Sequence, residues 1–242
     1  HLSTYLKTLS PSVRNPYGGL DAIRMGDFIE LPSLSVAEYT DGNVVIAEEV
    51  NIPSNAGDGK LQLVIVAINP NYGKNSNGTV TPHLIFQFKN VPGTGRMNVA
   101  ANAMTISYLN SPIRHYLASE YLLGLRLAGV PESVFWNITR KVPYIDLFGF
   151  LSRYNTITDK VWLPTEHEIT GQATGQNGQT HFSYYNSNDR RRKVATGPDN
   201  NGCYWTSTSS LNFHAIGSSG STTVGKPEAN TKQGIAPAFA IK

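Results

Sequence analysis

Short runs of β-branched and other apolar residues recur in the first half of the chain, each bounded by residues that favour turns. The clearest runs cover residues 44–46, 61–68 and 84–88, with loops rich in Asn, Gly and Ser between them. Runs of this length and composition predict β-strands. Their spacing shows no fixed repeat, so we expect irregular antiparallel sheets rather than a repeat architecture.

Two later stretches have the signals of helices. The pair Ser111-Pro112 places a capping hydroxyl before Pro at the first helical position, and Gly129 ends the apolar pattern that follows. The apolar face of this first helix is expected to consist of Ile113, Tyr116, Leu117, Tyr121, Leu123 and Leu127. The second helix is expected to begin at Thr165, which has the spacing of a capping box with Glu168, and to end near Gly171. Strands, two main helices and long loops together indicate an α+β fold.

The composition of the chain changes after residue 170. From there to residue 234, Asn, Ser, Thr, Gly, Gln and Tyr dominate, and aliphatic residues are sparse. The apolar anchors of this part are Cys203, Tyr204, Trp205, Phe213, Ile216 and the closing residues 234–241. Such anchors, with small polar residues between them, would allow a surface to vary while its frame stays fixed, although an ordinary loop-rich tail has the same composition. Composition alone leaves both interpretations open.

The overall composition is that of an ordered globular protein. The chain has 242 residues, 40% hydrophobic and 15% charged, which is enough for one large domain with a full core. Its 20 Lys and Arg nearly balance 17 Asp and Glu, so a broad nucleic-acid-binding face is excluded. The basic run at residues 190–193 is interpreted as a solvated loop or as partners of nearby carboxylates. No apolar run approaches the length of a membrane span.

The N-terminal residues differ from the rest of the chain. Residues 1–24 contain Pro11, Pro16 and the Gly18-Gly19 pair, and they open with His1 without a signal-peptide pattern. We expect an extended arm at residues 1–24 and a single domain over residues 25–242. Such an arm would be able to join copies of the chain into a homo-oligomer.

Three segments resemble one protein family. They are LIFQFKNVPGTGRMN at residues 84–98, WLPTEHE at residues 162–168, and YWTSTSS from residue 204 together with the closing GIAPAFAIK. These segments resemble the variable proteins of diversity-generating retroelements, which use the formylglycine-generating-enzyme type of C-type lectin fold. The similarity spans most of residues 24–242, and its last two segments are the specific ones. The resemblance implies a C-type lectin-like domain of this subtype.

In this family the end of the chain is a variable region, which adenine-directed mutagenesis rewrites and whose altered side chains lie on one exposed face. The resemblance places that region at about residues 204–241. Its fixed frame would be Tyr204, Trp205, Phe213, Ile216, Gly220, Gly234, Pro237 and Phe239. Its displayed, ligand-binding positions would be Ser209, Leu211, Asn212, His214, Gly217, Ser218, Thr222, Thr223, Gly225, Lys226, Glu228 and Asn230. Tyr184, Tyr185 and Asn188 would either rim the same surface or pack half-buried, and neither alternative is favoured.

Candidate catalytic residues do not combine into a recognisable site. Formylglycine-generating enzymes resemble the chain at LPTEHE, but their oxidation chemistry depends on two cysteines holding copper. Cys203 is the only cysteine, so it has no disulfide partner, and beside Tyr204 it is interpreted as a small core residue. Glu168 is explained as a helix cap, and Glu166 has no acid partner at a recognisable spacing. The six His residues are scattered, without the spacing HExxH.

Three oxygen-rich turns contain the residue types that calcium prefers, at residues 41–43, 58–59 and 199–202. None has the spacing of an EF-hand loop, so they are interpreted as plain turns. We expect no metal, no cofactor and no catalytic activity.

These observations favour a ligand- or receptor-binding protein that displays a diversified surface on a rigid lectin-like scaffold. We expect its ligand to be a protein or glycan receptor on a target cell, and its location to be a phage tail in the virion or, as an extracellular adhesin, a cell surface. An alternative of another class is a structural virion or surface module of the same fold, whose C-terminal face packs against a neighbour. A formylglycine-generating-type oxidase is a third alternative, which the single cysteine disfavours.

Overall fold

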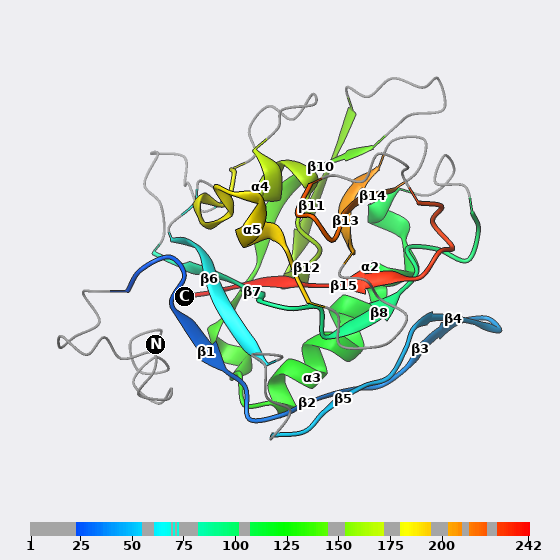
Figure 1. Cartoon of the computed structure of the whole chain (residues 1–242). Coiled ribbons are helices and arrows are strands. Elements are labelled where there is room, and N and C mark those ends of the chain that lie inside the picture. Colours follow the sequence, from blue (N-terminus) through cyan, green and yellow to red (C-terminus); the bar gives the residue numbers. More distant parts are fainter. Residues whose placement is uncertain are drawn as a thin grey trace.

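The structure of the chain is a computed structural model. It describes residues 23–54, 61–68, 70, 72, 82–101, 107–144, 153–171, 180–194, 203–209, 213–221 and 227–242. Nearly all of the predicted arm at residues 1–24 lies outside the described residues. Within them antiparallel strands predominate and helices are few (Figure 1), which gives the β-rich α+β fold that the sequence predicts.

The first sheet holds the last strand of the chain in its interior. Its order is β1 (Phe28–Glu30), β6 (Gln62–Ile68), β7 (Leu84–Phe88), β16 (Ala238–Ile241) and β12 (Val161–Trp162), with β9 (Phe135–Trp136) also beside β16. Neighbouring strands are antiparallel, and Phe239 of β16 pairs with Phe86 of β7. Both of these strands are buried along their whole length, which explains why their sequences are apolar without alternation. The strands predicted at residues 61–68 and 84–88 are confirmed as β6 and β7.

The second sheet carries the C-terminal hairpin at one edge. Its order is β14 (Phe213–Ile216), β13 (Tyr204–Ser209), β15 (Gln233–Ile235), β8 (Gly93–Gly95), β4 (Val44–Ala47) and β3 (Tyr39–Asp41). Strands β13 and β15 are parallel, with Tyr204 opposite Gly234, and the other pairs are antiparallel. Only residues 236–237 separate β15 from β16, so the chain passes directly from the second sheet into the first. The strand predicted at residues 44–46 is β4.

Two-stranded ribbons and short helical turns complete the fold. The ribbons are β2 (Leu34–Val36) with β5 (Val50–Ile52), and β10 (Ile138–Tyr144) with β11 (Arg153–Asp159). Turns of 3-10 helix cover Tyr108–Asn110, Glu132–Val134 and Ser183–Tyr185. The short helices α4 (Glu166–Thr170) and α5 (Asn188–Arg191) lie near the C-terminal hairpin.

The predicted first helix is present, but its exposed side differs from the prediction. It consists of α2 (Pro112–Tyr116), a π-helical turn (Leu117–Tyr121) and α3 (Leu122–Leu127), and the chain turns away at Gly129 with φ +101°. Leu123 and Leu127 are 45% and 75% exposed, and Leu125 is buried in their place. Each residue advances about 100° around a helix, so Leu123 lies roughly 200° from the buried Tyr121. The Ser111 hydroxyl also makes no cap and instead donates to the Tyr108 carbonyl at 2.9 Å.

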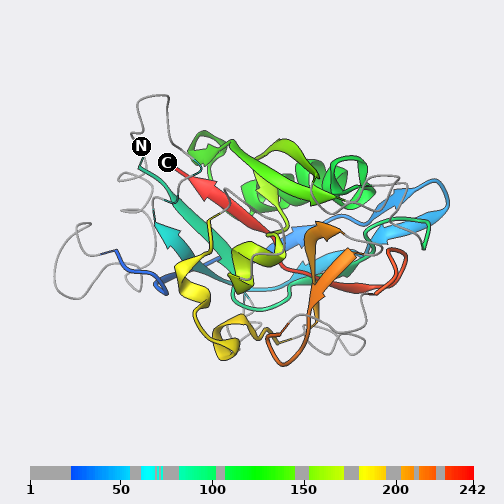
Figure 2. The same ribbon diagram turned by 90° about the horizontal axis from the view of Figure 1, so that it is seen from above.

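The core consists of two clusters, one on each face of the first sheet. On one face Phe86 and Phe239 stack with ring centroids 5.8 Å apart, in a cluster that includes Tyr121 beside α3. Their neighbours Ile85 and Ala240 belong to the opposite cluster, because successive side chains of a strand point to opposite faces. Figure 2 shows the green helices α2 and α3 on one side of the red strand β16 and the yellow helical segments on the other. Among the residues described, no helix is long and apolar enough to cross a membrane.

Candidate functional site

The predicted variable region is built on the hairpin β13–β14. Every residue of β13 is buried. Trp205 is fully buried, its ring lies edge-on to Phe213 at 6.3 Å, and its Nε1 donates to the Gly95 carbonyl of β8 at 2.9 Å. Next to it, the Tyr204 hydroxyl donates to the Arg191 carbonyl at 3.0 Å. Bulky side chains therefore connect the hairpin to β8 of the same sheet and to α5.

The residues that the resemblance assigns to the frame share one property, which is burial. They are Tyr204, Trp205, Phe213, Ile216, Gly220, Gly234, Pro237 and Phe239. Several of them belong to the two core clusters that pack against the first sheet. The backbone of this region is thus fixed from inside the protein.

The residues predicted to be displayed do not all behave alike. Ser218 and Glu228 are exposed, and His214, Gly217 and Asn230 are half-buried. The positions outside the described residues are Leu211, Asn212, Thr222, Thr223, Gly225 and Lys226. The displayed set therefore includes both solvent-facing and partly covered positions.

Ser209 is a correction to the predicted surface. It is only 2% exposed, and its hydroxyl donates to the Pro143 carbonyl of β10 at 3.4 Å. The ribbon β10–β11 packs against β13, so a side chain at this position is covered although its residue type is polar. The sequence gives no signal for this packing, because the ribbon lies far away along the chain.

The displayed positions lie in two neighbourhoods. Ser218 belongs to a tight turn in which the Gly217 amide donates to the Ser221 carbonyl at 2.7 Å. Glu228 and Asn230 flank Ala229, whose backbone is hydrogen-bonded to residues 98 and 101. We refer to residues 217–221 together with Asn188 as the turn–α5 surface.

Helix α5 borders this turn. Gly220 has φ +82°, and a Cβ atom there would lie 2.1 Å from the Asn188 carbonyl oxygen. Asn188 is exposed, as a residue at the rim of a binding surface would be, whereas Tyr184 is half-buried and Tyr185 is fully buried. Of the three residues, Asn188 alone is exposed, whereas Tyr185 packs in the second core cluster.

This close packing leads to a prediction for Gly220→Ala. The methyl group would meet a backbone atom and the residue would be held at positive φ, so we expect a loss of about 2–4 kcal/mol in the free energy of unfolding. The matched control is Gly42→Ala, since Gly42 has φ +59° but nothing within 4 Å of an added Cβ. Its loss should be about 1–2 kcal/mol. Urea denaturation of both variants measures the difference, and equal losses would contradict a tight contact between the turn and α5.

His214 forms a contact that the sequence did not predict. Its Nδ1 is hydrogen-bonded to the carboxylate of Glu166, which is only 6% exposed. The Glu166 amide donates to the Thr208 hydroxyl at 2.9 Å, and the Thr206 hydroxyl donates to the His214 carbonyl at 3.1 Å. The start of α4 is thereby connected to both strands of the hairpin. These partners are 48 residues apart, so no local sequence signal could have revealed the pair.

Helix α4 itself follows its predicted signals closely. The Thr165 hydroxyl accepts a hydrogen bond from the Glu168 amide at 3.1 Å, and the Glu168 carboxylate accepts one from the Thr165 amide at 2.5 Å. This is the predicted capping box. The helix ends at Gly171, whose φ of +71° is left-handed, as predicted.

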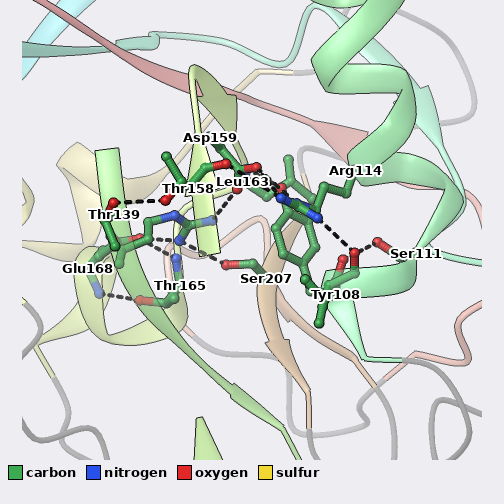
Figure 3. A network of polar contacts seen from close by, with 12 residues as sticks. Tyr108, Ser111, Arg114, Thr139, Thr158, Asp159, Leu163, Thr165, Glu168 and Ser207 are labelled. Atoms are coloured by element: carbon green, nitrogen blue, oxygen red, sulfur yellow. Dashed lines mark hydrogen bonds and ion pairs between the residues drawn. The ribbon is translucent and has the colours of Figure 1, made fainter. Parts of the chain in front are cut away.

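A buried ionic network lies beneath the hairpin (Figure 3). Arg140 of β10 has a fully buried side chain, and its Nη1 donates to Glu168 at 3.3 Å and to the Ser207 hydroxyl of β13 at 3.3 Å. Its Nη2 lies 3.9 Å from Asp159, which Arg114 of α2 also contacts at 2.9 Å. The network therefore joins α2, the ribbon, α4 and β13 in the interior.

Two aromatic rings enclose the same guanidinium. The Cζ atom of Arg140 lies 5.7 Å from the ring centre of Tyr108 and 5.4 Å from that of Trp162. Cation–π attraction of this kind strengthens where water is excluded. Burial raises the pKa of Tyr108 far above its usual value, so that hydroxyl stays neutral. It accepts a hydrogen bond from the Leu163 amide at 3.1 Å.

The basic run at residues 190–193 divides into exposed and buried members. Arg192 pairs with Asp189 at 3.7 Å, and both side chains are well exposed, in agreement with a solvated pair. Arg190 lies over the Tyr184 ring at 5.2 Å. Arg191 donates to the carbonyls of Tyr185 and Thr170. Lys193 is only 5% exposed, so the solvated interpretation is wrong for this residue.

The titratable side chains around the hairpin lie in packed or paired positions. No group of three or more His, Cys, Asp or Glu within the described ranges is placed to hold a metal ion. Cys203 is half-buried rather than a core residue, because it precedes β13 instead of lying within it. The buried carboxylates Glu168 and Asp159 are engaged by guanidinium groups. The exposed polar residues beside the hairpin are those of the turn–α5 surface, among them Ser218, Ser219 and Asn188.

The fold and this surface define the class of the protein: a β-rich α+β domain with a buried C-terminal frame and an exposed polar turn. The family model described as a domain of unknown function, DUF6273, matches residues 80–242, and the chain belongs to this family. No curated protein and no solved structure matches the chain. The matched residues contain the hairpin, α4, α5 and the network of Figure 3.

Proposed function

We propose that this chain is a ligand-binding module, a variable protein of a diversity-generating retroelement with a C-type lectin-like domain of the formylglycine-generating-enzyme subtype. The observation that carries the proposal is the division within residues 203–242. The bulky residues there are buried, whereas Ser218 and Ser219 of the turn are exposed. A frame fixed from inside tolerates exchange of the side chains that do not contribute to it. The β-rich α+β class supports the proposed fold.

The binding surface would be the turn–α5 surface together with Glu228 and Asn230, extended by the displayed positions outside the described residues. Ser, Gly and Asn make up most of it, and residues of these kinds supply adaptable hydrogen bonds in antibody loops. The ligand would be a protein or glycan receptor on a target cell, and the protein would act from a phage tail or a cell surface. Weak contacts would gain strength from several copies, joined through residues 1–24.

Exchange of exposed residues tests the functional division directly. We expect Ser218→Tyr combined with Glu228→Lys to move the melting temperature by no more than about 2–4 °C, since exposed substitutions usually cost under ~0.5 kcal/mol each. The same double variant should change which spots a bead-coupled, multivalent form of the domain binds on a glycan microarray and which cells it binds in a bacterial panel. Unchanged binding together with unchanged stability would exclude these residues from the binding surface.

The DNA around the gene tests the origin of the surface. A neighbouring reverse-transcriptase gene and a near-duplicate of the DNA for residues 204–241, differing only at adenines, are expected. A solitary gene without this repeat would instead favour a structural virion or surface module whose C-terminal face packs against a neighbour.

A further inference from the structure

Two leucines on the outer side of α3 are exposed to solvent. Leu123 is 45% and Leu127 75% exposed, although leucine is among the residue types that are most often buried. They are four positions apart in an α-helix, so their side chains lie next to each other on one face. The half-buried Leu122 beside them packs against the first core cluster. Apolar side chains that gather on one face, in contrast to scattered ones, are typical of contact surfaces.

The packing of α3 against β2 holds the two leucines outward. Gly124 lies so close to β2 that an added Cβ atom would be 2.6 Å from the Val36 side chain and 2.8 Å from the Ser35 carbonyl oxygen. The next residue, Leu125, is fully buried. The helix therefore cannot rotate to cover the exposed leucines without separating from β2. A contact surface that is fixed in advance loses little conformational entropy when a partner binds.

Charged residues flank the leucines in a balanced arrangement. Glu120 precedes Leu123 by three positions, and Arg126 follows it by three. Glu132 pairs with Arg126 at 3.0 Å and with Lys160 at 3.4 Å, and these three side chains remain partly exposed. The two carboxylates and two cations carry no net charge. The face is therefore not suited to a strongly acidic or strongly basic partner, and it does not repel a second copy of itself.

The order of these residues is its own complement in an antiparallel helix pair. When two copies of the helix cross at Leu123 in opposite directions, Glu120 of each copy lies opposite Arg126 of the other. The small Ser119 then lies opposite Leu127. The ion pair of Arg126 within the chain involves Nη2, so other N–H donors of the guanidinium remain for a second carboxylate. Parallel helices would instead place like charges opposite each other.

We propose that this face of the helix is a two-fold contact through which two copies of the chain associate. Leu123 lies at the centre of the contact, and the pairs of Glu120 with Arg126 form its rim. One helix face buries less than the roughly 800 Å² per partner of a standard interface, so the dimer should be weak. Figure 2 shows α3 and the yellow helical segments on opposite sides of β16, so α5 stays accessible in the dimer. The contact does not depend on the proposed binding function.

Sedimentation equilibrium of the full chain, from micromolar to millimolar concentration, measures the association. We expect the average mass to rise with concentration. Leu123→Glu should raise the dissociation constant more than about tenfold, because two carboxylates then meet at the centre of the contact. The matched control is Val194→Glu, since Val194 is 68% exposed but lies in the segment after α5. A mass that does not rise, an equal loss in the control, or association that Leu123→Glu leaves unchanged would each overturn the proposal.

Exchange of the two rim charges tests the antiparallel geometry. Arg126→Glu brings carboxylates together across the contact, and Glu120→Arg brings guanidinium groups together. Each single variant should therefore associate about tenfold more weakly than the unaltered chain. A mixture of the two variants restores both opposite-charge pairs in a heterodimer, so mixing should recover the association. A mixture that associates no better than either variant alone would rule out the antiparallel contact.

Discussion

Replacing Trp205 with Ala should lower the free energy of unfolding by about 3–5 kcal/mol, the usual cost of removing a large aromatic side chain from a core. The side chain is fully buried and belongs to the first core cluster. Its loss removes the contact with Phe213 and leaves the Gly95 carbonyl without the indole donor. Chemical denaturation of the purified domain measures this loss. We expect the variant to bury less surface in its native state and to unfold at much lower denaturant concentration.

A matched variant separates the contribution of side-chain volume to stability from that of the hydrogen bond. Trp205→Phe keeps an aromatic ring but removes the Nε1 donor, so it should lose less than Trp205→Ala, about 1–3 kcal/mol. The double variant Ser218→Tyr with Glu228→Lys, at exposed positions, should lose the least stability of the three. If Trp205→Ala were tolerated as well as that variant, the division between a buried frame and an exchangeable surface would be untenable.

Local signals in the sequence predicted local structure well. The pairing of Thr165 with Glu168 and the glycine at position 171 fixed both ends of α4, because capping interactions join residues three or four positions apart. The three clearest apolar runs each form a strand. Both kinds of signal depend only on near neighbours along the chain, and such neighbours are visible in a single sequence.

The tertiary contacts of the candidate site could not be predicted in this way. The contact of His214 with Glu166 and that of Arg140 with Glu168 join residues from different elements. Lys193 gave no local sign of burial, since it ends a run of arginines that are partly or fully solvated. Its acceptors at positions 88 and 89 become neighbours only when the sheet forms. Whether a polar group is buried depends on such distant hydrogen-bond partners rather than on the local sequence pattern.

Arg140→Met should be as damaging as the loss of Trp205, at about 3–5 kcal/mol, although Met has a shape suited to the core. The substitution leaves Glu168 buried without its guanidinium partner and weakens the hold on Asp159. Breaking a buried pair from one side costs several kcal/mol because the remaining charge is neither hydrated nor paired. The control is Arg126→Met, which breaks the shorter but half-exposed pair with Glu132, at 3.0 Å. That change should cost under about 1 kcal/mol, since water solvates both partners.

A double-mutant cycle then tests whether charge pairing or ring packing makes Arg140 important. Glu168→Gln removes the carboxylate charge but keeps an oxygen that can accept from the Thr165 amide, so the capping box survives. With the charge gone, Arg140→Met no longer leaves an unpaired buried carboxylate at position 168. The free energy of unfolding of the double variant should therefore fall by about 1–3 kcal/mol less than the sum of the two single losses. Strictly additive losses in urea denaturation would mean that the contacts with Tyr108 and Trp162 account for the effect instead. In that case the guanidinium of Arg140 would stabilise the network of Figure 3 mainly through its contacts with the two rings rather than through its pairing with Glu168.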